Sequence, residues 1–210
     1  MIKLTPEILQ LNDKLFIGHG YHKNCYHHPF DKSLCIKLAY NEEGQKDLSR
    51  ELKYLAVLKK KDKDYSVLPK YYGPVQTNLG LGHVYELLED YDGQKSKTLR
   101  DYLTDASLLK ANLPMLITEL KKLKTTLIDN EILTMGIASE NILFQRKNPA
   151  DKLPSLRVIN DMGSPALIPL EYHFSCFAKA KVKRHWERFM KHILKICSLP
   201  EAKKLVENIA

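Results

Sequence analysis

Long apolar runs are absent from the chain, whose purely apolar stretches extend over only a few residues. A helix that crosses a bilayer needs about 20 consecutive apolar residues, so no transmembrane segment is expected. The N-terminal residues also lack the charged-then-apolar order of a signal peptide, and internal repeats and low-complexity segments are missing. These absences predict a cytoplasmic protein with no membrane partner.

Cysteine is sparse, with four residues in a chain of 210 and none in a Cys-x-x-Cys pair. This usage predicts buried thiols of a reducing compartment and argues against a disulfide framework or a zinc site. Cys25 and Cys35 are ten residues apart in a predicted hairpin, so a metal site there stays open as an alternative.

Basic residues exceed acidic ones, 33 to 25, which leaves a net charge of +8. Much of the excess lies at residues 59–63 and 179–188. It is enough to attract a polyanion such as a nucleotide phosphate, an acidic partner or RNA. A solvated turn and the polar face of a helix are the ordinary alternative. Charge alone does not choose among these readings.

The pattern of apolar residues separates the chain into a strand-rich and a helical part. In the first ninety residues it predicts strands around a turn within 15–40, a helix on Leu48, Leu52, Leu55 and Leu58, and strands at 67–75 and 83–88. Later it predicts a first helical turn capped by Thr98, a helix at 114–129, short strands at 142–144 and 156–159, and a helical end from Tyr172 that buries Trp186, Phe189, Ile193 and Ile196. The fold class is therefore α+β, with regions 1–90 and 91–210, and not a doubly wound parallel sheet.

Two signals in the strand-rich region suit phosphate binding. Gly18 and Gly20 lie between predicted strands, where glycine lets backbone amides approach phosphate oxygens, although a plain hairpin turn is an equal alternative. Lys37 lies in an apolar run and must reach a surface or an anion, since an unpaired buried ammonium is costly. Glu51, on the following helix, would pair with Lys37, but the residue taken alone favours an ordinary exposed helix position.

A third signal suits metal binding. Asn141 directly precedes one short predicted strand, and Asp161 follows another. Side chains at the ends of neighbouring strands can converge on one Mg²⁺, because hard cations take oxygen ligands and phosphates complete the shell. A turn cap at Asn141 and a helix cap at Asp161 are the alternatives.

The chain resembles the YrbL family, whose proteins are named for the bacterial PhoP regulatory network. The stretches that carry the resemblance are 22–29, 35–37, 50–54, 133–135 and 167–170. The family in turn resembles a reduced protein kinase, which implies an antiparallel-sheet N-lobe, a reduced helical C-lobe and ATP between them.

The resemblance assigns roles to individual residues. Lys37 matches the phosphate-binding lysine and Glu51 its helix partner, and Asn141 and Asp161 match the two metal-binding residues. Glu86 to Leu88 would form the hinge whose backbone meets adenine. Where kinases keep a His-Arg-Asp triplet, this chain has Thr134-Met135-Gly136, so Gly136 stands in place of the catalytic aspartate.

Three functions remain open on these grounds. The first is a weak or inactive kinase-like protein that binds ATP and Mg²⁺, and the second is an active atypical kinase in which phosphate positioning supplies most of the rate. The third is a basic adaptor that keeps the fold as a scaffold. Lys37, Asn141 and Asp161 together favour nucleotide binding. We expect a nucleotide and a protein acceptor or regulatory partner, and no nucleic acid.

Overall fold

The computed structural model describes residues 8–151, 153–166 and 169–209. The chain forms two compact units. The first, here called the sheet unit, contains the residues up to Ser49 and Pro69–Leu88; the second, the helical unit, contains Arg50–Leu68 and the residues from Glu89 onward. The first unit ends two residues before the predicted border at residue 90. Residues 50–68, which the sequence analysis placed in the N-terminal region, group with the helical unit.

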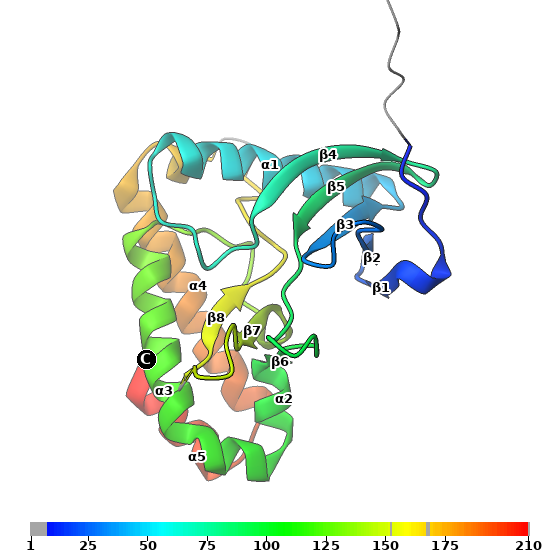
Figure 1. Ribbon diagram of the computed structural model, residues 1–210. Helices are drawn as coiled ribbons and strands as arrows, with labels where there is room; N and C mark the ends of the chain where they lie inside the picture. The colour runs from blue at the N-terminus through cyan, green and yellow to red at the C-terminus, as the bar shows by residue number, and fades with distance from the viewer. Residues whose placement is uncertain (1–7, 152, 167–168, 210) are drawn as a thin grey trace, which may run out of the picture. The chain divides into compact units, whose positions relative to one another are not determined.

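The sheet unit is built on one antiparallel sheet of five strands (Figure 1). The strands are β1 (Phe16–His19), β2 (Lys23–His27), β3 (Leu34–Ala39), β4 (Tyr71–Thr77) and β5 (Gly80–Glu86), in the order β1-β2-β3-β5-β4. A 3₁₀ turn, η1 (Asp13–Leu15), leads into β1. The predicted strands around a turn within 15–40 are confirmed, and Tyr26 lies opposite Ile36.

Strand alternation gives this sheet one apolar face. Tyr26, Ile36, Leu38 and Val84 form a buried cluster together with Leu11. Successive side chains of a strand point to opposite faces, so Lys37, between Ile36 and Leu38, lies on the other face. The antiparallel pairing and the absence of parallel neighbours among β1–β5 confirm the α+β class.

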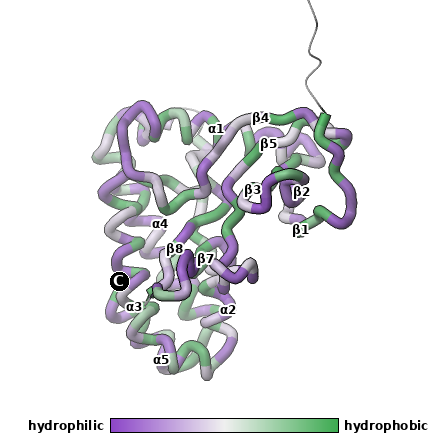
Figure 2. Tube along the Cα trace, in the orientation of Figure 1, coloured by the Kyte–Doolittle hydropathy of each residue, from purple (hydrophilic) through white to green (hydrophobic). Residues whose placement is uncertain are grey.

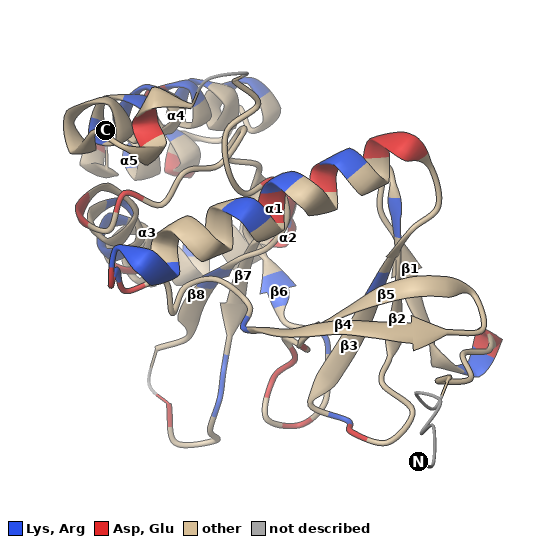
Figure 3. Ribbon diagram, turned by 90° about the horizontal axis from the view of Figure 1, so that it is seen from above, with Lys and Arg blue, Asp and Glu red and all other residues tan. Residues whose placement is uncertain are grey.

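Helix α1 (Glu42–Lys60) is divided between the two units after Ser49. The predicted leucine stripe is confirmed at Leu48, Leu55 and Leu58, which are buried, whereas Leu52 is half-buried. Charged residues of both signs occur along the helix among uncharged ones (Figure 3). The helix ends in the basic turn, where Asp62 adopts a left-handed backbone conformation with φ of 51°.

The helical unit contains most of the helices and a small second sheet. Its helices are α2 (Leu99–Thr104), α3 (Ala106–Asp129), α4 (Ser175–Ile196) and α5 (Pro200–Ile209), with 3₁₀ turns η2 (Ser139–Asn141) and η3 (Leu170–Tyr172). Its strands are β6 (Lys97–Thr98), β7 (Ile142–Gln145) and β8 (Ser155–Val158), in the order β6-β7-β8. None of the described helices combines the length and apolar character needed to cross a membrane.

Local capping explains where two of these helices begin. Thr98 caps α2 as predicted, in a capping box with Asp101. Helix α3 starts eight residues before the predicted Pro114, because Asp105 accepts hydrogen bonds from the N–H groups of Ser107 and Leu108. Proline suits a first helical turn, which suggested a start at Pro114, but here it lies inside the helix.

The C-terminal region is mainly helical as predicted, but α4 begins at Ser175, residues 197–199 separate it from α5, and one predicted core residue is exposed. Trp186, Phe189 and Ile193 are buried as expected, but Ile196 is 42% exposed. It is the last residue of α4, where the backbone turns toward α5. Helices α3, α4 and α5 pack on one another, and apolar and polar residues alternate along each of them (Figure 2). The burial of one stripe per helix forms the core of this unit.

Glu131 links three segments of the helical unit. Its carboxylate contacts Lys61 at 2.9 Å and Lys63 at 3.2 Å, just beyond the end of α1. Its carbonyl accepts a 2.7 Å hydrogen bond from the Tyr54 hydroxyl, which in turn accepts one from the N–H of Leu133. The basic turn is therefore partly neutralised, and residues 131–133 are fixed against α1.

The surroundings of Glu131 change its acidity. Burial alone would raise the pKa of this carboxyl, but hydrogen bonds from Lys61, Ser175 and Lys63 outweigh it and lower the pKa to about 2. A carboxyl whose pKa is depressed in the folded state stabilises the fold above its unfolded pKa, and this contribution is lost as the pH falls toward the folded value.

We therefore expect Glu131→Gln to flatten the acid side of the stability profile. The wild type should lose stability between about pH 4.5 and pH 2, and the variant should lose less over that interval while being less stable at pH 7. Urea denaturation followed by Trp186 fluorescence at each pH measures this. Parallel profiles for the two proteins would show that the Glu131 contacts do not form in solution.

Candidate functional site

Asn141 and Asp161 meet because β7 and β8 pair in antiparallel register. Ile142 lies opposite Val158, so the residue before β7 and the residues after β8 lie at the same end of the pair. The Asn141 amide nitrogen donates a 3.0 Å hydrogen bond to Oδ2 of Asp161, and the Ile159 N–H donates to the Asn141 carbonyl at 2.9 Å. The structure thus brings these two predicted site residues together.

The backbone leading to Asp161 adopts an uncommon conformation. Asn160 and Asp161 have φ values of 64° and 54°, in the left-handed region that costs energy for residues other than glycine. Backbone hydrogen bonds hold the segment: the Met135 N–H donates to the Asp161 carbonyl at 2.7 Å, and the Gly163 N–H donates to Leu133 at 2.9 Å. The loop at residues 133–135 therefore fixes the direction of the Asp161 side chain.

Gly136 follows this loop at an exposed position. A Cβ added there would meet nothing within 4 Å, so this position has space for a side chain. The peptide before it is tied to Asp161 through Met135. Gly136 therefore directly follows a residue that is hydrogen-bonded to Asp161, and it carries no side chain.

Lys37 lies on β3 in the sheet unit, opposite Cys25 on one side and His83 on the other. Its ammonium lies 4.7 Å from the centre of the Tyr85 ring, a cation–π contact on the face away from the apolar cluster. A hydrogen bond with Cys35, and then the positive charge of Lys37, lower the pKa of Cys25 although burial opposes them. The lysine thus reaches the other face of the sheet, as its position in an apolar run requires.

The two glycines belong to the β1–β2 hairpin. Gly18 pairs with Cys25 beside a bulge in β1, and the Gly20 N–H donates to the Lys23 carbonyl at 2.8 Å. The hairpin that the sequence offered as an alternative is what this backbone forms. A contact of these glycines with phosphate stays a prediction.

The remaining predicted site residues lie in different settings. Glu51 is 1% exposed, so the alternative of an ordinary exposed helix position is wrong. The Glu86 N–H donates to Lys70, and the Glu86 carbonyl accepts from the Cys35 thiol. Leu88 is buried at the end of the sheet unit. The pairing of Glu51 with Lys37 and the adenine contacts of Glu86 and Leu88 stay predictions.

Comparison with known proteins identifies the family. The family model described as PhoP regulatory network protein YrbL matches residues 9–194. The chain belongs to the YrbL family. YrbL of Escherichia coli K12 is 36% identical over 185 residues, which cover 87% of each chain, and YrbL of Shigella flexneri gives the same values. The resemblance drawn from the matching stretches is confirmed, although residues 167 and 168 of one stretch lie outside the described part.

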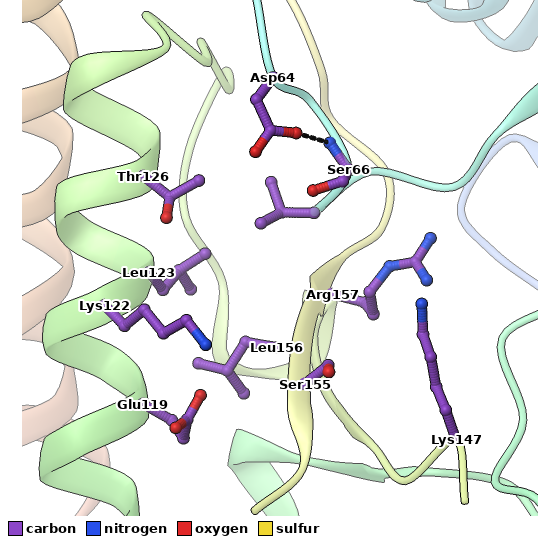
Figure 4. A pocket seen from close by; sticks show the side chains of 11 residues that line it. Asp64, Ser66, Glu119, Lys122, Leu123, Thr126, Lys147, Ser155, Leu156 and Arg157 are labelled. Carbon is purple, nitrogen blue, oxygen red and sulfur yellow. Dashed lines mark hydrogen bonds between the residues drawn. The ribbon is translucent and has the colours of Figure 1, made fainter.

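A cavity elsewhere in this YrbL-family chain is lined mainly by residues that hold the fold together. It measures about 210 Å³ and lies beside α3 and β8 (Figure 4). Arg157, on β8, donates to Gln145 and to the Leu68 carbonyl, which fastens β8 to the connection after α1. Because Glu119, Lys122 and Lys147 mix both signs of charge around the cavity, it favours no single class of ligand.

Several residues that shape the site escaped the sequence analysis. Tyr54 and Glu131 hold residues 131–133 through contacts between positions 77 residues apart. No local pattern signals such a contact. The cavity beside Gly136 was missed too, although the basic run 179–188 marked part of the helix that forms it.

Gly163 supplies a test of the strained segment. It has φ of 97°, and an added Cβ would lie 2.9 Å from the hydroxyl oxygen of Tyr172. We expect Gly163→Ala to lower the free energy of unfolding by about 1–3 kcal/mol, whereas Gly136→Ala should change it by less than about 0.5 kcal/mol. Urea denaturation of both variants measures this, and equal effects would contradict the described backbone around Asp161.

Proposed function

We propose that this YrbL-family chain has a reduced protein-kinase-like fold and binds ATP with Mg²⁺ in a regulatory role. The observation that carries the proposal is the contact of Asn141 with Asp161 at the end of the β7–β8 pair. An amide and a carboxylate offer oxygen ligands, which Mg²⁺ prefers. The amide nitrogen of Asn141 is used in the contact, so the amide oxygen is the atom that would meet a cation.

The small number of protein ligands favours a nucleotide-bound metal over a bare one. In the described part of the chain, no group of three or more His, Cys, Asp or Glu residues is placed to hold a metal. Mg²⁺ is commonly held by one or two protein side chains together with substrate phosphates and water. Asn141 and Asp161 fit that donor set, and bound Mg²⁺ would neutralise phosphate charge.

Lys37 is the residue that we propose to hold phosphate oxygens. Its ammonium emerges on the sheet face that lacks the apolar cluster, and a phosphate there would add a charge-assisted hydrogen bond. Gly18 and Gly20 lie on the neighbouring hairpin of the same sheet.

Gly136 argues for slow or absent phosphoryl transfer. In a kinase, a carboxylate at this position accepts the proton of the acceptor hydroxyl. Glycine has no side chain that could accept this proton, so the positioning of the phosphates would have to supply the rate of transfer. The proposal is therefore, first of all, that the chain binds a nucleotide. If it transfers no phosphate, the protein is an inactive pseudokinase. The basic adaptor is the second candidate, favoured by the net charge of +8.

We expect ATP with Mg²⁺ to raise the melting temperature of the wild type. At a ligand concentration 100 times the Kd, binding adds about 2.7 kcal/mol, or several degrees for a chain of this size. Asp161→Asn, Asn141→Ala and Lys37→Met should each lose most of this shift. Differential scanning fluorimetry with and without the ligand measures it.

Two matched variants serve as controls for this experiment. Glu140→Gln removes the exposed carboxylate next to Asn141, and Lys70→Met removes a lysine that, like Lys37, lies over a tyrosine ring of the sheet. Both should keep the shift. Loss of the shift in a control, or its retention in Asp161→Asn, would place the nucleotide elsewhere, and no shift in the wild type would favour the adaptor.

A carboxylate introduced at residue 136 tests whether phosphoryl transfer is limited by the lack of a general base at this position. General-base assistance contributes about 10²–10⁴ in rate, so Gly136→Asp should increase transfer of label from γ-labelled ATP to an acceptor by at least about tenfold. Gly136→Ala should not. The gain should vanish when Asp161→Asn is added, and no gain in a variant that still binds ATP would contradict the assignment of Gly136.

A further inference from the structure

A second cavity of the helical unit lies between residues 135–137 and one face of α4. It measures about 400 Å³. Five residues of α4 on its wall carry basic side chains: His185, Arg188, Lys191, His192 and Lys195. Residues 185, 188, 192 and 195 are three or four positions apart, so they share one face of the helix. No acidic residue lines the cavity.

Within the part of the chain that the structure describes, the positive charges of this wall have no carboxylate partner, unlike several others of the helical unit. Among the described residues, carboxylates pair with Lys61, Lys63, Arg146 and Lys181. None pairs with Arg188, Lys191 or Lys195 in the same part of the chain. Basic residues follow one another along α4 in Figure 3, and Glu187 is the one acidic residue within that helix. The cavity therefore collects positive charge that no protein group compensates.

The behaviour of His185 agrees with this concentration of charge. Burial, and then the nearby Lys181, Arg184 and Arg188, lower the pKa of its imidazole, although a hydrogen bond with the backbone of Thr134 opposes them. A positive environment disfavours a further positive charge. An anion in the cavity would relieve the repulsion among these groups.

The size of the cavity restricts the kind of anion. About 400 Å³ lies within the range of small-molecule sites, which spans about 300–1,000 Å³. Arginine matches phosphate geometry with two parallel hydrogen bonds, and lysine adds a compact charge. A concave, small and cationic site suits the phosphate group of a small molecule better than an extended strand of RNA or a flat protein surface.

We propose that this cavity binds a small phosphorylated molecule, next to the loop that holds Asp161. Met135 and Ile137 on its wall flank Gly136, and the Met135 N–H also donates to the Asp161 carbonyl. A ligand here therefore touches the segment that sets the Asn141–Asp161 contact. The proposal does not depend on nucleotide binding, because none of the lining residues belongs to the proposed Mg²⁺ site.

Trp186 provides a direct readout. It is the one tryptophan of the chain, it is 1% exposed, and its ring packs edge-on against Phe189 at 5.6 Å. Phe189 lines the cavity. Titration of the protein with inorganic phosphate or glycerol phosphate, without nucleotide or Mg²⁺ and at constant ionic strength, should change its fluorescence in a saturable way.

Matched variants separate a site from general attraction by a basic helix. Arg188→Gln with Lys195→Gln should raise the Kd at least tenfold. Lys179→Gln with Lys183→Gln removes the same charge from the same helix, outside the cavity lining, and should change the Kd less than twofold. Gly136→Asp, which adds a carboxylate at the wall, should weaken phosphate binding as well.

Three results would overturn the proposal. Equal weakening in both double variants would mean nonspecific attraction. Loss of phosphate binding in Asp161→Asn would place the phosphate at the proposed nucleotide site, whereas its retention there keeps the two sites distinct. Saturable binding of an acidic peptide or RNA in the absence of any phosphate binding would assign the cavity to a macromolecular partner.

Discussion

The antiparallel pairing of β7 with β8 is the constraint on which the candidate site depends. It places the residue before one strand and the residues after the other at the same end, so Asn141 reaches Asp161. The left-handed backbone at residues 160 and 161 then turns the aspartate toward the asparagine. Such a conformation persists where its surroundings determine it, and here the hydrogen bonds from Met135 and to Leu133 do so.

The loop at residues 133–137 has two roles in this arrangement. On one side it is hydrogen-bonded to the segment around Asp161. Tyr54 also holds it, because the Tyr54 hydroxyl accepts a hydrogen bond from the Leu133 N–H. On the other side it forms part of the cationic cavity with α4. Gly136 lies between these two sides. It adds no charge to the cavity wall, whose positive charge comes from the basic residues of α4.

Sequence patterns predicted those features that depend on local spacing. Strand alternation located β2, β3, β7 and β8, the leucine stripe located α1, and the order of Asn141 and Asp161 around two short strands anticipated their contact. The start of α3 was missed because Pro114 resembles a first helical residue, while the cap at Asp105 decides where the helix begins. The burial of Glu51, the exposure of Ile196 and the contacts of Glu131 depend on tertiary packing, which periodicity does not encode.

The proposed binding of a metal-bound nucleotide by Asn141 and Asp161 can be tested directly at the side-chain amide of Asn141. In ¹⁵N-labelled protein, its NH₂ resonances can be assigned by their absence from Asn141→Asp. Substoichiometric Mn²⁺ with ATP should broaden these resonances through paramagnetic relaxation, and Mg²⁺ with ATP should not. Broadening confined to other residues, with the Asn141 amide unchanged, would contradict the proposed site.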